Sequence, residues 1–594
     1  MRQTVEKYYR YIFFLIIASF LVWYQTELGS VYETVTQCFM IEWKYIVLNV
    51  FTLFIMMGIL GIVLNSMGVA CIVVDIILGS VSLINYHVVA YRGLPLTILD
   101  IVNIKMAVDI GKSYKIIWDE MTDLILLCMI LVWILGGVIF WYEKKNNIKW
   151  RKISLFDFLF LLVSGIFIYC GYLSPNPIKT KETIGWSWTE AYHQYGYLAC
   201  TLEAASQMKR VVRQPFGYDE RKITEIEIEQ KETSNDEKPD IILILNETFY
   251  DLSEILELET DTDYLKNIHQ MENLLEGKAV VPVNGGGTNK SEYELLTSNS
   301  MELMNTSSAD PFNILQLKGA NSIVSILKKN GYQTLAAHSE PGVNYSRAKA
   351  YPDLGFDYVH FNEDFTKEYY GDRWYATDES LYKNLIEWYE DMGEDPRFLY
   401  LLTVQNHGDW EMNKEELDTV HVLNDYGDYT DRINEYLSCI ALTDQAFSFL
   451  TSYYSKVDRP VIICIVGDHA PVFAADIIDE RYDEMESARM LRSVPLYIWS
   501  NFDLPDMNPN TISMNYVSPL LLRLAGFNNL SYYYEYMLNM REAVPVISSY
   551  DVYIDSAGVE YPYTSESPYT DMVNTYLYME YNNLQSDRRQ ELFE

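Results

Sequence analysis

The sequence predicts a chain in two parts, an N-terminal membrane domain of five helices followed by an α/β domain. Five apolar stretches of membrane-spanning length lie within the first 173 residues. There, 13 basic and 12 acidic residues give a net charge of +1, whereas the remaining 32 basic and 70 acidic residues give −38. In this acidic part, apolar runs of strand length alternate with helix-like segments, which is typical of α/β folds.

The predicted membrane domain comprises residues 1–173, with spans at 8–24, 45–64, 67–85, 124–142 and 155–173. Asp75 and Asp157 are acidic residues within the third and fifth spans. The first span resembles a signal peptide in length, but no small-residue cleavage site follows it before Trp23 and Tyr24. We therefore interpret it as an uncleaved anchor.

The basic residues predict the orientation, because cytoplasmic loops carry an excess of Lys and Arg. Arg2, Lys7 and Arg10 precede the first span, and five basic residues crowd the short connection 143–154. The basic residues of the loop 88–120 weaken this bias. We expect a multi-pass protein of the cell membrane with a cytoplasmic N-terminus and everything after residue 173 outside the cell.

Residues 174–240 are predicted to connect the two domains, and residues 241–594 to form the outer domain. The connector contains a helix-like stretch at 189–213 and a polar run at 225–240, which is typical of a solvated linker. The apolar content excludes a disordered chain, and the acidic charge excludes a basic nucleic-acid binder. The seven cysteines show neither metal-type spacing nor a disulfide framework.

Three apolar runs of the outer domain predict strands of a parallel sheet. They are IILILNETF at 241–249, RFLYLLTVQNHGDW at 397–410 and VIICIVGDHAP at 461–471, and helix-like segments lie at 312–329, 378–392 and 432–456. Open parallel sheets bind ligands beyond the carboxyl ends of their strands. The three runs end in Glu247, in His407 and in the pair Asp468 and His469. We expect the functional site at this edge.

The segment GGGTNKSEYELLTS at 285–298 places three glycines before Thr288 and a predicted helix. Taken alone, Thr288 fits the role of a helix cap, with Glu292 supporting the helix start. Together, Glu247, Thr288, Asp468 and His469 offer two carboxylates, one hydroxyl and one imidazole, which suit one Mn²⁺, Mg²⁺ or Zn²⁺ ion. Such an ion lowers the pKa of a hydroxyl enough to make it a nucleophile.

Five motifs follow one another along the chain: NETF, GGGT followed by SEYELLTS, HSEPGVNYSR at 338–347, QNHGDW and GDHAP. In this order they resemble the lipoteichoic acid synthase family of phosphoglycerol transferases. The segments 91–101 and 578–585 also resemble that family, so the resemblance covers nearly the whole chain. It implies a sulfatase-like outer domain of the alkaline phosphatase superfamily.

The resemblance also implies roles for individual residues. Thr288 is implied as the nucleophile, and Glu247, Thr288, Asp468 and His469 as ligands of one divalent ion, usually manganese. Arg347 and His407 are implied to contact the substrate phosphate and glycerol, with His338 near them. His407 is suited to general acid–base catalysis. Tyr345 stands where the family commonly has a tryptophan, which alters the aromatic wall of the expected substrate site.

The implied function is transfer of phosphoglycerol from phosphatidylglycerol to a hydroxyl of a surface glycolipid, glycan or teichoic-type polymer during cell wall biogenesis. The alternatives within the superfamily are a phosphoethanolamine transferase and a phosphodiesterase. A non-catalytic membrane scaffold is a hypothesis of a different class, and the complete set of nucleophile and ligands in the sequence disfavours it.

Overall fold

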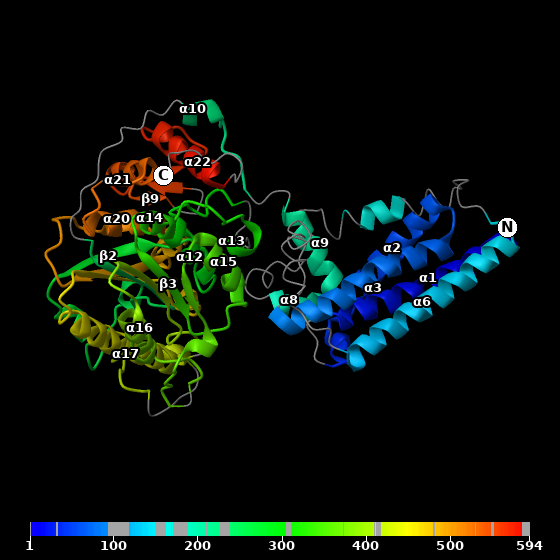
Figure 1. Cartoon of the computed structure of the whole chain (residues 1–594), viewed down its shortest axis with the longest axis horizontal. Coiled ribbons are helices and arrows are strands. Elements are labelled where there is room, and N and C mark those ends of the chain that lie inside the picture. Colours follow the sequence, from blue (N-terminus) through cyan, green and yellow to red (C-terminus); the bar gives the residue numbers. More distant parts are fainter. Residues whose placement is uncertain are drawn as a thin grey trace. The chain divides into compact units, whose positions relative to one another are not determined.

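The computed structural model describes residues 2–30, 34–92, 118–148, 162–167, 169, 188–208, 212–224, 238–304, 310–371, 373–408, 410, 417–478, 482–528, 530–547 and 552–584. They form two compact units, residues 1–211 and 212–594 (Figure 1). The first unit contains the apolar helices and the second the strands of the predicted α/β domain.

Among the described residues of the first unit, four helices are long and apolar enough to cross a membrane: α1 (Arg2–Leu28), α2 (Trp43–Leu64), α3 (Met67–Arg92) and α6 (Glu120–Lys145). Apolar helices are therefore present where the first four spans are predicted, and each extends beyond the predicted limits. Most of the fifth predicted span, 155–173, lies outside the described residues. Within this span, residues 162–167 are described and are helical. Most of the predicted family segment 91–101 and most of the polar run 225–240 also lie outside the described residues.

Polar side chains buried among these helices form hydrogen bonds with one another or with the backbone of a further helix, α9 (Tyr197–Met208). Asp75 of α3 accepts a hydrogen bond of 2.7 Å from the Gln25 side chain of α1. The Glu27 carboxylate accepts from the backbone N–H of Tyr197, and Asn49 accepts from that of Ala199. These contacts cap the first turn of α9, whose N–H groups have no partner within the helix.

The predicted helical stretch 189–213 is divided in two. A short helix, α8 (Trp188–Tyr195), precedes α9, and Gly196 separates them with a φ of +83°. Glycine suits this position because a side chain there would meet Glu27 and Asn49, and because L-residues rarely adopt such a φ.

The second unit is built on an eight-stranded mixed sheet in the order β4-β3-β5-β1-β6-β7-β2-β8. The strands are β1 (Asp240–Asn246), β2 (Leu274–Val280), β3 (Gln333–His338), β4 (Tyr358–His360), β5 (Arg397–Leu402), β6 (Val461–Gly467), β7 (Ser493–Ser500) and β8 (Asn510–Ser513). The first five strands of that order are mutually parallel. β7 runs antiparallel to both β6 and β2, so the sheet is not parallel throughout as the apolar runs predict.

The three predicted strands are the neighbours β5, β1 and β6 at the centre of the sheet, and all their residues are buried. Helices cover both faces: α16 (Asp378–Asp391) and α17 (Thr430–Tyr454) lie on one side, and α12 (Thr288–Thr297), α14 (Ile323–Lys329) and α20 (Val517–Leu524) on the other (Figure 1). Burial on both faces explains why these strands are apolar throughout.

Two of the three predicted helices are present as α16 and α17. The third prediction, one helix over 312–329, is wrong. The structure has α13 (Pro311–Ile314) and α14 instead, each with its own N-cap: Asp310 accepts from the backbone N–H groups of Phe312 and Asn313, and Ser322 from that of Ser325. Gly319, with a φ of +74°, lies in the segment between them.

The remaining helices of this unit are α10 (Glu220–Thr224), α11 (Lys266–His269), α15 (Arg347–Leu354), α18 (Ala474–Ile477), α19 (Glu484–Met490), α21 (Tyr532–Ala543) and α22 (Thr570–Leu584). A small antiparallel sheet comprises β9 (Val546–Ile547), β10 (Val552–Ile554) and β11 (Glu560–Pro562), in the order β11-β10-β9.

The segment 212–224 belongs to this second unit through its own contacts. Val212 forms a β-bridge with Met304, and the backbone N–H of Arg213 donates to Leu303 over 2.7 Å. The Tyr578 hydroxyl of α22 donates to the carbonyl of Phe216 over 2.8 Å. The folded unit therefore starts before the long polar run.

Candidate active site

Thr288 is the first residue of α12, and Gly287 is its N-cap. Gly285, Gly286 and Gly287 have φ values of +70°, +143° and +88°, which explains the three consecutive glycines. The cap role considered for Thr288 is therefore wrong, because Gly287 occupies the N-cap position and Thr288 is already within the helix. The Thr288 hydroxyl lies at the positive end of a helix. It is close enough to Asp468 to lower the pKa of that carboxyl group, partly opposing the effects of burial and of Glu247.

Glu247, Asp468 and His469 form a compact buried cluster at the carboxyl ends of β1 and β6. One ligand atom from each lies within 4.8 Å of the others. His469 Nε2 is 3.2 Å from Asp468 Oδ2 and 3.6 Å from Glu247 Oε1. Parallel pairing places Asn246 beside Gly467, so the residues that follow the two strands meet. The structure thus brings together the three predicted ligands and Thr288.

The cluster has the properties of a cation site. His469 Nδ1 lies 2.9 Å from the Ala470 carbonyl, to which it donates, so Nε2 is left as the ligand atom. Asp468 Oδ1 accepts from the Thr248 backbone N–H, whereas Oδ2 is buried with no hydrogen-bond partner. Burial, followed by the charge of Glu247, raises the pKa of Asp468 to about 7. A divalent ion would balance two buried carboxylates and use this oxygen.

Arg347 starts α15 and is buried against α12. Its Nε and Nη2 lie 2.8 and 2.6 Å from Glu292 Oε2. The other Glu292 oxygen accepts from the hydroxyls of Tyr351 and Tyr400, over 2.6 and 3.1 Å. Because Glu292 binds two of the three guanidinium nitrogens, the orientation of Arg347 is fixed. The expected support of the α12 start by Glu292 is wrong, since this carboxylate holds Arg347 instead.

His338, the last residue of β3, lies on the other side of Arg347. Its Nδ1 is 3.2 Å from the Leu402 carbonyl of β5, and its Nε2 is 3.4 Å from Nη1 of Arg347. Burial, followed by the charge of Arg347, holds the pKa of His338 well below its usual range. The imidazole is therefore neutral, donates to Leu402 and accepts from Arg347.

His407 follows β5 at the same edge of the sheet and is partly exposed. Its ring centroid is 4.8 Å from that of Tyr375, and its carbonyl accepts from Nη2 of Arg373 over 2.8 Å. Arg373 in turn forms a buried ion pair of 2.8 Å with Glu435 of α17. These contacts fix the turn that carries His407.

Tyr345 places its ring under the guanidinium of Arg347, with 4.9 Å from the ring centroid to Cζ. Tyr345 and Ser346 have φ values of +53° and +56°, so the backbone here is strained. Burial raises the pKa of the phenol, and the carboxylates of Asp310, Glu247 and Asp468 raise it further. Tyr345 is therefore close to both the arginine and the acidic cluster.

Sequence reasoning missed two residues of this region. Glu292 was considered only in connection with the helix start, and no local pattern reveals a partner 55 residues away. Glu340 follows His338 by two residues; burial raises its pKa, while the charges of Lys367 and His407 lower it, which places it near His407. Its position just beyond the buried strand β3 is the sequence pattern from which Glu340 could have been predicted as a site residue.

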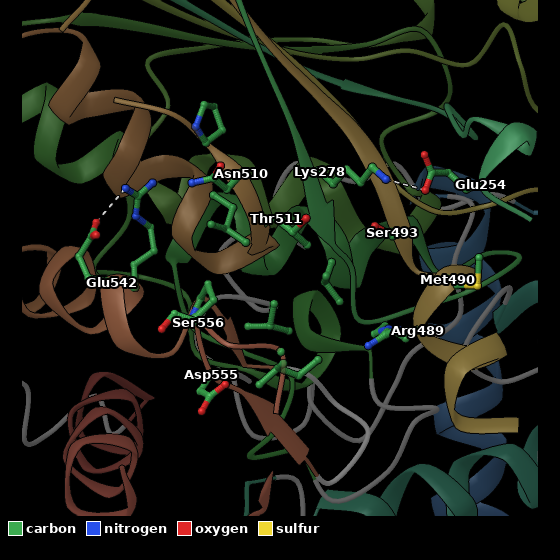
Figure 2. Close-up of a pocket in the computed structure, with 18 of the residues that line it drawn as sticks. Glu254, Lys278, Arg489, Met490, Ser493, Asn510, Thr511, Glu542, Asp555 and Ser556 are labelled. Carbon is green, nitrogen blue, oxygen red and sulfur yellow. Dashed lines mark hydrogen bonds and ion pairs between the residues drawn. The ribbon is translucent and has the colours of Figure 1, made fainter. Parts of the chain in front are cut away.

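A separate cavity of about 700 Å³ lies among β2, β7, β8 and the turn after β10 (Figure 2). None of the predicted site residues lines it. Two of its cations are already paired, since Lys278 lies 2.5 Å from Glu254 and Arg541 lies 3.1 Å from Glu542. The cavity therefore offers less to an anionic ligand than the edge that carries Arg347.

Comparison with known proteins supports the predicted resemblance. Residues 239–527, just under half of the chain, match the sulfatase family model. A protein of Rhizobium meliloti (strain 1021) named for cyclic β-1,2-glucan modification is 27% identical over 365 residues, which are 59% of this chain and 55% of that protein. The chain spans about half the length of the curated relatives it matches.

One of the solved structures compared with this chain has a TM-score above 0.5 and shows a similar fold. The phosphoglycerol transferase of Streptococcus pyogenes, in complex with sn-glycerol-1-phosphate, has a TM-score of 0.51 and 18% identity, covering 63% of this chain and 95% of that one. The lipoteichoic acid synthase of Listeria monocytogenes has a TM-score of 0.40 and 16% identity, with coverage of 60% and 91%. The match of residues 239–527 to the sulfatase family model and the similarity of the fold to that of a phosphoglycerol transferase both agree with the predicted resemblance.

Proposed function

We propose that this protein is a membrane-anchored phosphoglycerol transferase. It takes phosphoglycerol from phosphatidylglycerol and passes it to a hydroxyl of a surface glycolipid, glycan or teichoic-type polymer. The observation that carries the proposal is the position of Thr288, whose hydroxyl lies at a helix N-terminus beside the buried cluster of Glu247, Asp468 and His469. The fold of a phosphoglycerol transferase supports this class of reaction.

Glu247, Asp468, His469 and the Thr288 hydroxyl would hold one divalent ion, for which Mn²⁺ is our proposal and Mg²⁺ and Zn²⁺ are the alternatives. The unpartnered Asp468 oxygen and the Nε2 of His469 fit that role. When bound, the ion lowers the pKa of the threonine hydroxyl and balances negative charge.

Transfer proceeds in two displacements at phosphorus. Thr288 Oγ forms a bond to phosphorus as the bond to the diacylglycerol oxygen breaks, and the proton lost by Thr288 is matched by one gained by diacylglycerol. The acceptor hydroxyl then forms its bond to phosphorus while the Oγ–phosphorus bond breaks, and Thr288 regains a proton as the acceptor loses one. In each step one phosphate ester bond forms and one breaks, so the number of ester bonds at phosphorus is unchanged.

Of the other predicted residues, Arg347 and His407 act on the phosphoglycerol group that is transferred, and His338 and Tyr345 position Arg347. Arg347 offers Nη1 to a phosphate oxygen, because Glu292 already holds its Nε and Nη2. His407, partly exposed at the same edge, moves the proton between the leaving or attacking oxygen and solvent. His338 keeps the guanidinium in place, and Tyr345 forms the aromatic wall beside it.

We further propose that the catalytic domain acts outside the cell and that the N-terminus is cytoplasmic. The basic residues before the first span and between 143 and 154 support this orientation. The four apolar helices support anchoring in the membrane, where phosphatidylglycerol resides.

The decisive experiment uses the full-length protein in vesicles with phosphatidylglycerol labelled in its glycerol headgroup. Thr288→Ala is expected to abolish both transfer and a covalent adduct, whereas Thr288→Ser retains a hydroxyl and some of each. Mass spectrometry of the adduct distinguishes phosphoglycerol from the phosphoethanolamine of the alternative transferase. Release of label to water alone would identify a phosphodiesterase, and full transfer by Thr288→Ala would refute the mechanism.

A further inference from the structure

Two large apolar side chains stand exposed beside the candidate site. Trp374 is 82% exposed and Val472 is 63% exposed. Trp374 directly precedes Tyr375, whose ring lies against His407, and Val472 follows His469 by three residues. Both therefore lie on loops at the edge of the sheet where the site is, and we call them the apolar rim.

The neighbours of Trp374 hold this part of its loop in place. Arg373 is buried and bonds to Glu435 and to the carbonyl of His407. Tyr375 packs on the His407 ring on the other side. With both flanking residues anchored, the indole is presented to the outside from a fixed backbone.

Val472 is presented in a similar way. Phe473, the next residue, is 1% exposed and packs against Trp410 with 5.3 Å between ring centroids. On the other side, a Cβ placed on Gly285 would come within 3.2 Å of Val472 Cα, so Val472 also borders the glycine segment before Thr288. One rim residue thus belongs to the His407 side of the site and the other to the Thr288 side.

We propose that the apolar rim binds the surface of the lipid bilayer around the donor molecule. This inference rests on the proposed lipid donor. A tryptophan has an apolar body with a polar N–H, which suits it to the boundary between lipid headgroups and acyl chains. The part of the chain after residue 173 has a net charge of −38, so long-range electrostatics repel it from anionic lipid. Apolar contact is the local attraction that brings a headgroup to Thr288.

The test compares one reaction on two forms of the donor, using the full-length protein in vesicles. The first donor is long-chain phosphatidylglycerol within phosphatidylcholine vesicles, and the second is dihexanoyl phosphatidylglycerol as a dissolved monomer. Trp374→Ala is expected to lower the rate on vesicle lipid about tenfold and Val472→Ser about threefold, with less than a twofold change on the monomer. Tyr358→Ala, an exposed aromatic at the amino end of β4, is the matched control.

An equal loss on both donors would mean that the rim acts inside the site, and no loss on either would mean that it does not bind lipid; each result overturns the proposal. A second measurement is independent of activity. A dye attached at Trp374→Cys is expected to be quenched by lipids that carry a shallow spin label, and a dye at Tyr358→Cys is not. If the wild-type protein processes neither donor, the proposed function fails, and the quenching alone decides whether the rim binds lipid.

Discussion

The candidate site has an arginine side, around Arg347, and an acidic side, around Asp468, and each contains buried carboxylates. Of Glu292 and Asp468, only Glu292, on the arginine side, has hydrogen-bond partners for both carboxylate oxygens and a guanidinium as its opposite charge. Glu292 accepts hydrogen bonds from Arg347, Tyr351 and Tyr400, so the protein itself balances and satisfies it. Asp468 and Glu247 face a single imidazole, and Asp468 Oδ2 has no hydrogen-bond partner. The arginine side is therefore a fixed scaffold, whereas on the acidic side we expect a cation to balance the carboxylates, as proposed above.

Among the substitutions that test this difference between the two sides, Asp468→Asn should have the largest effect on metal affinity and transfer. Removing one buried charge partner is worth ~3–5 kcal/mol, so we expect metal affinity and transfer to fall by about 1000-fold. The metal-free variant should also melt at a higher temperature than the metal-free wild type, because the repulsion with Glu247 is gone. Metal analysis, turnover and thermal denaturation check these outcomes.

Asp444→Asn is the matched control. Asp444 is a buried aspartate that binds Asn267 and Ile268, away from the predicted ligands. Its replacement should leave metal content unchanged. Wild-type metal affinity in Asp468→Asn would show that the acidic side is not a cation site.

The second prediction concerns pH. Since the pKa of Asp468 is raised to about 7 in the folded protein and is near 4 when unfolded, protonation stabilises the metal-free fold. This contribution is complete below about pH 4 and is lost as the pH rises through 7. Metal and protons compete for the same oxygen, so displacing the one proton of Asp468 should lower the apparent metal affinity by about 50-fold from pH 7 to 5, with a slope that approaches tenfold per pH unit below the pKa.

Calorimetry of metal binding at pH 5, 6 and 7 measures that slope, and melting of the chelated protein over the same range measures the stability term. The two curves should move in opposite directions, with affinity rising and metal-free stability falling as the pH increases. A metal affinity independent of pH would contradict the assignment of Asp468 as a ligand.

Glu292→Gln tests the arginine side and should have a smaller effect. The amide keeps an oxygen for the two tyrosine hydroxyls but loses the charge that orients Arg347. We expect the KM for the lipid donor to rise about tenfold, with metal affinity unchanged. Glu294→Gln, on the same helix and bonded to the Met301 backbone, is the control. A loss of metal binding in Glu292→Gln would mean that the two sides are not independent.

Tyr345→Trp should have the smallest effect. It enlarges the aromatic surface next to Arg347 without changing any charge. We expect less than a threefold change in the KM for the donor, and Tyr345→Phe separates the effect of ring size from that of the hydroxyl. A change of more than tenfold in kcat would show that Tyr345 takes part in the chemistry.

The sequence was most informative where physical constraints are local. Continuous apolar runs predicted β1, β5 and β6, and the residues after them lie together because parallel strands end at one edge. The break between α13 and α14 was overlooked although its N-caps, Asp310 and Ser322, are local signals. The antiparallel β7 was not predictable, since pairing between distant segments determines it. Glu292 was missed for the same reason, because its partner Arg347 is adjacent only in the folded chain.

The contacts of residues 212–224 have a consequence for proteolysis of this protein. A protease that cuts between residues 224 and 238 would break the chain after the Val212–Met304 bridge and the Phe216–Tyr578 bond, both of which belong to the folded catalytic unit. The nicked fragments would remain associated without a covalent link. We therefore expect that release of the whole second unit needs a cut before residue 212, and that a cut in the acidic run leaves the second unit held by these contacts to the N-terminal part of the chain.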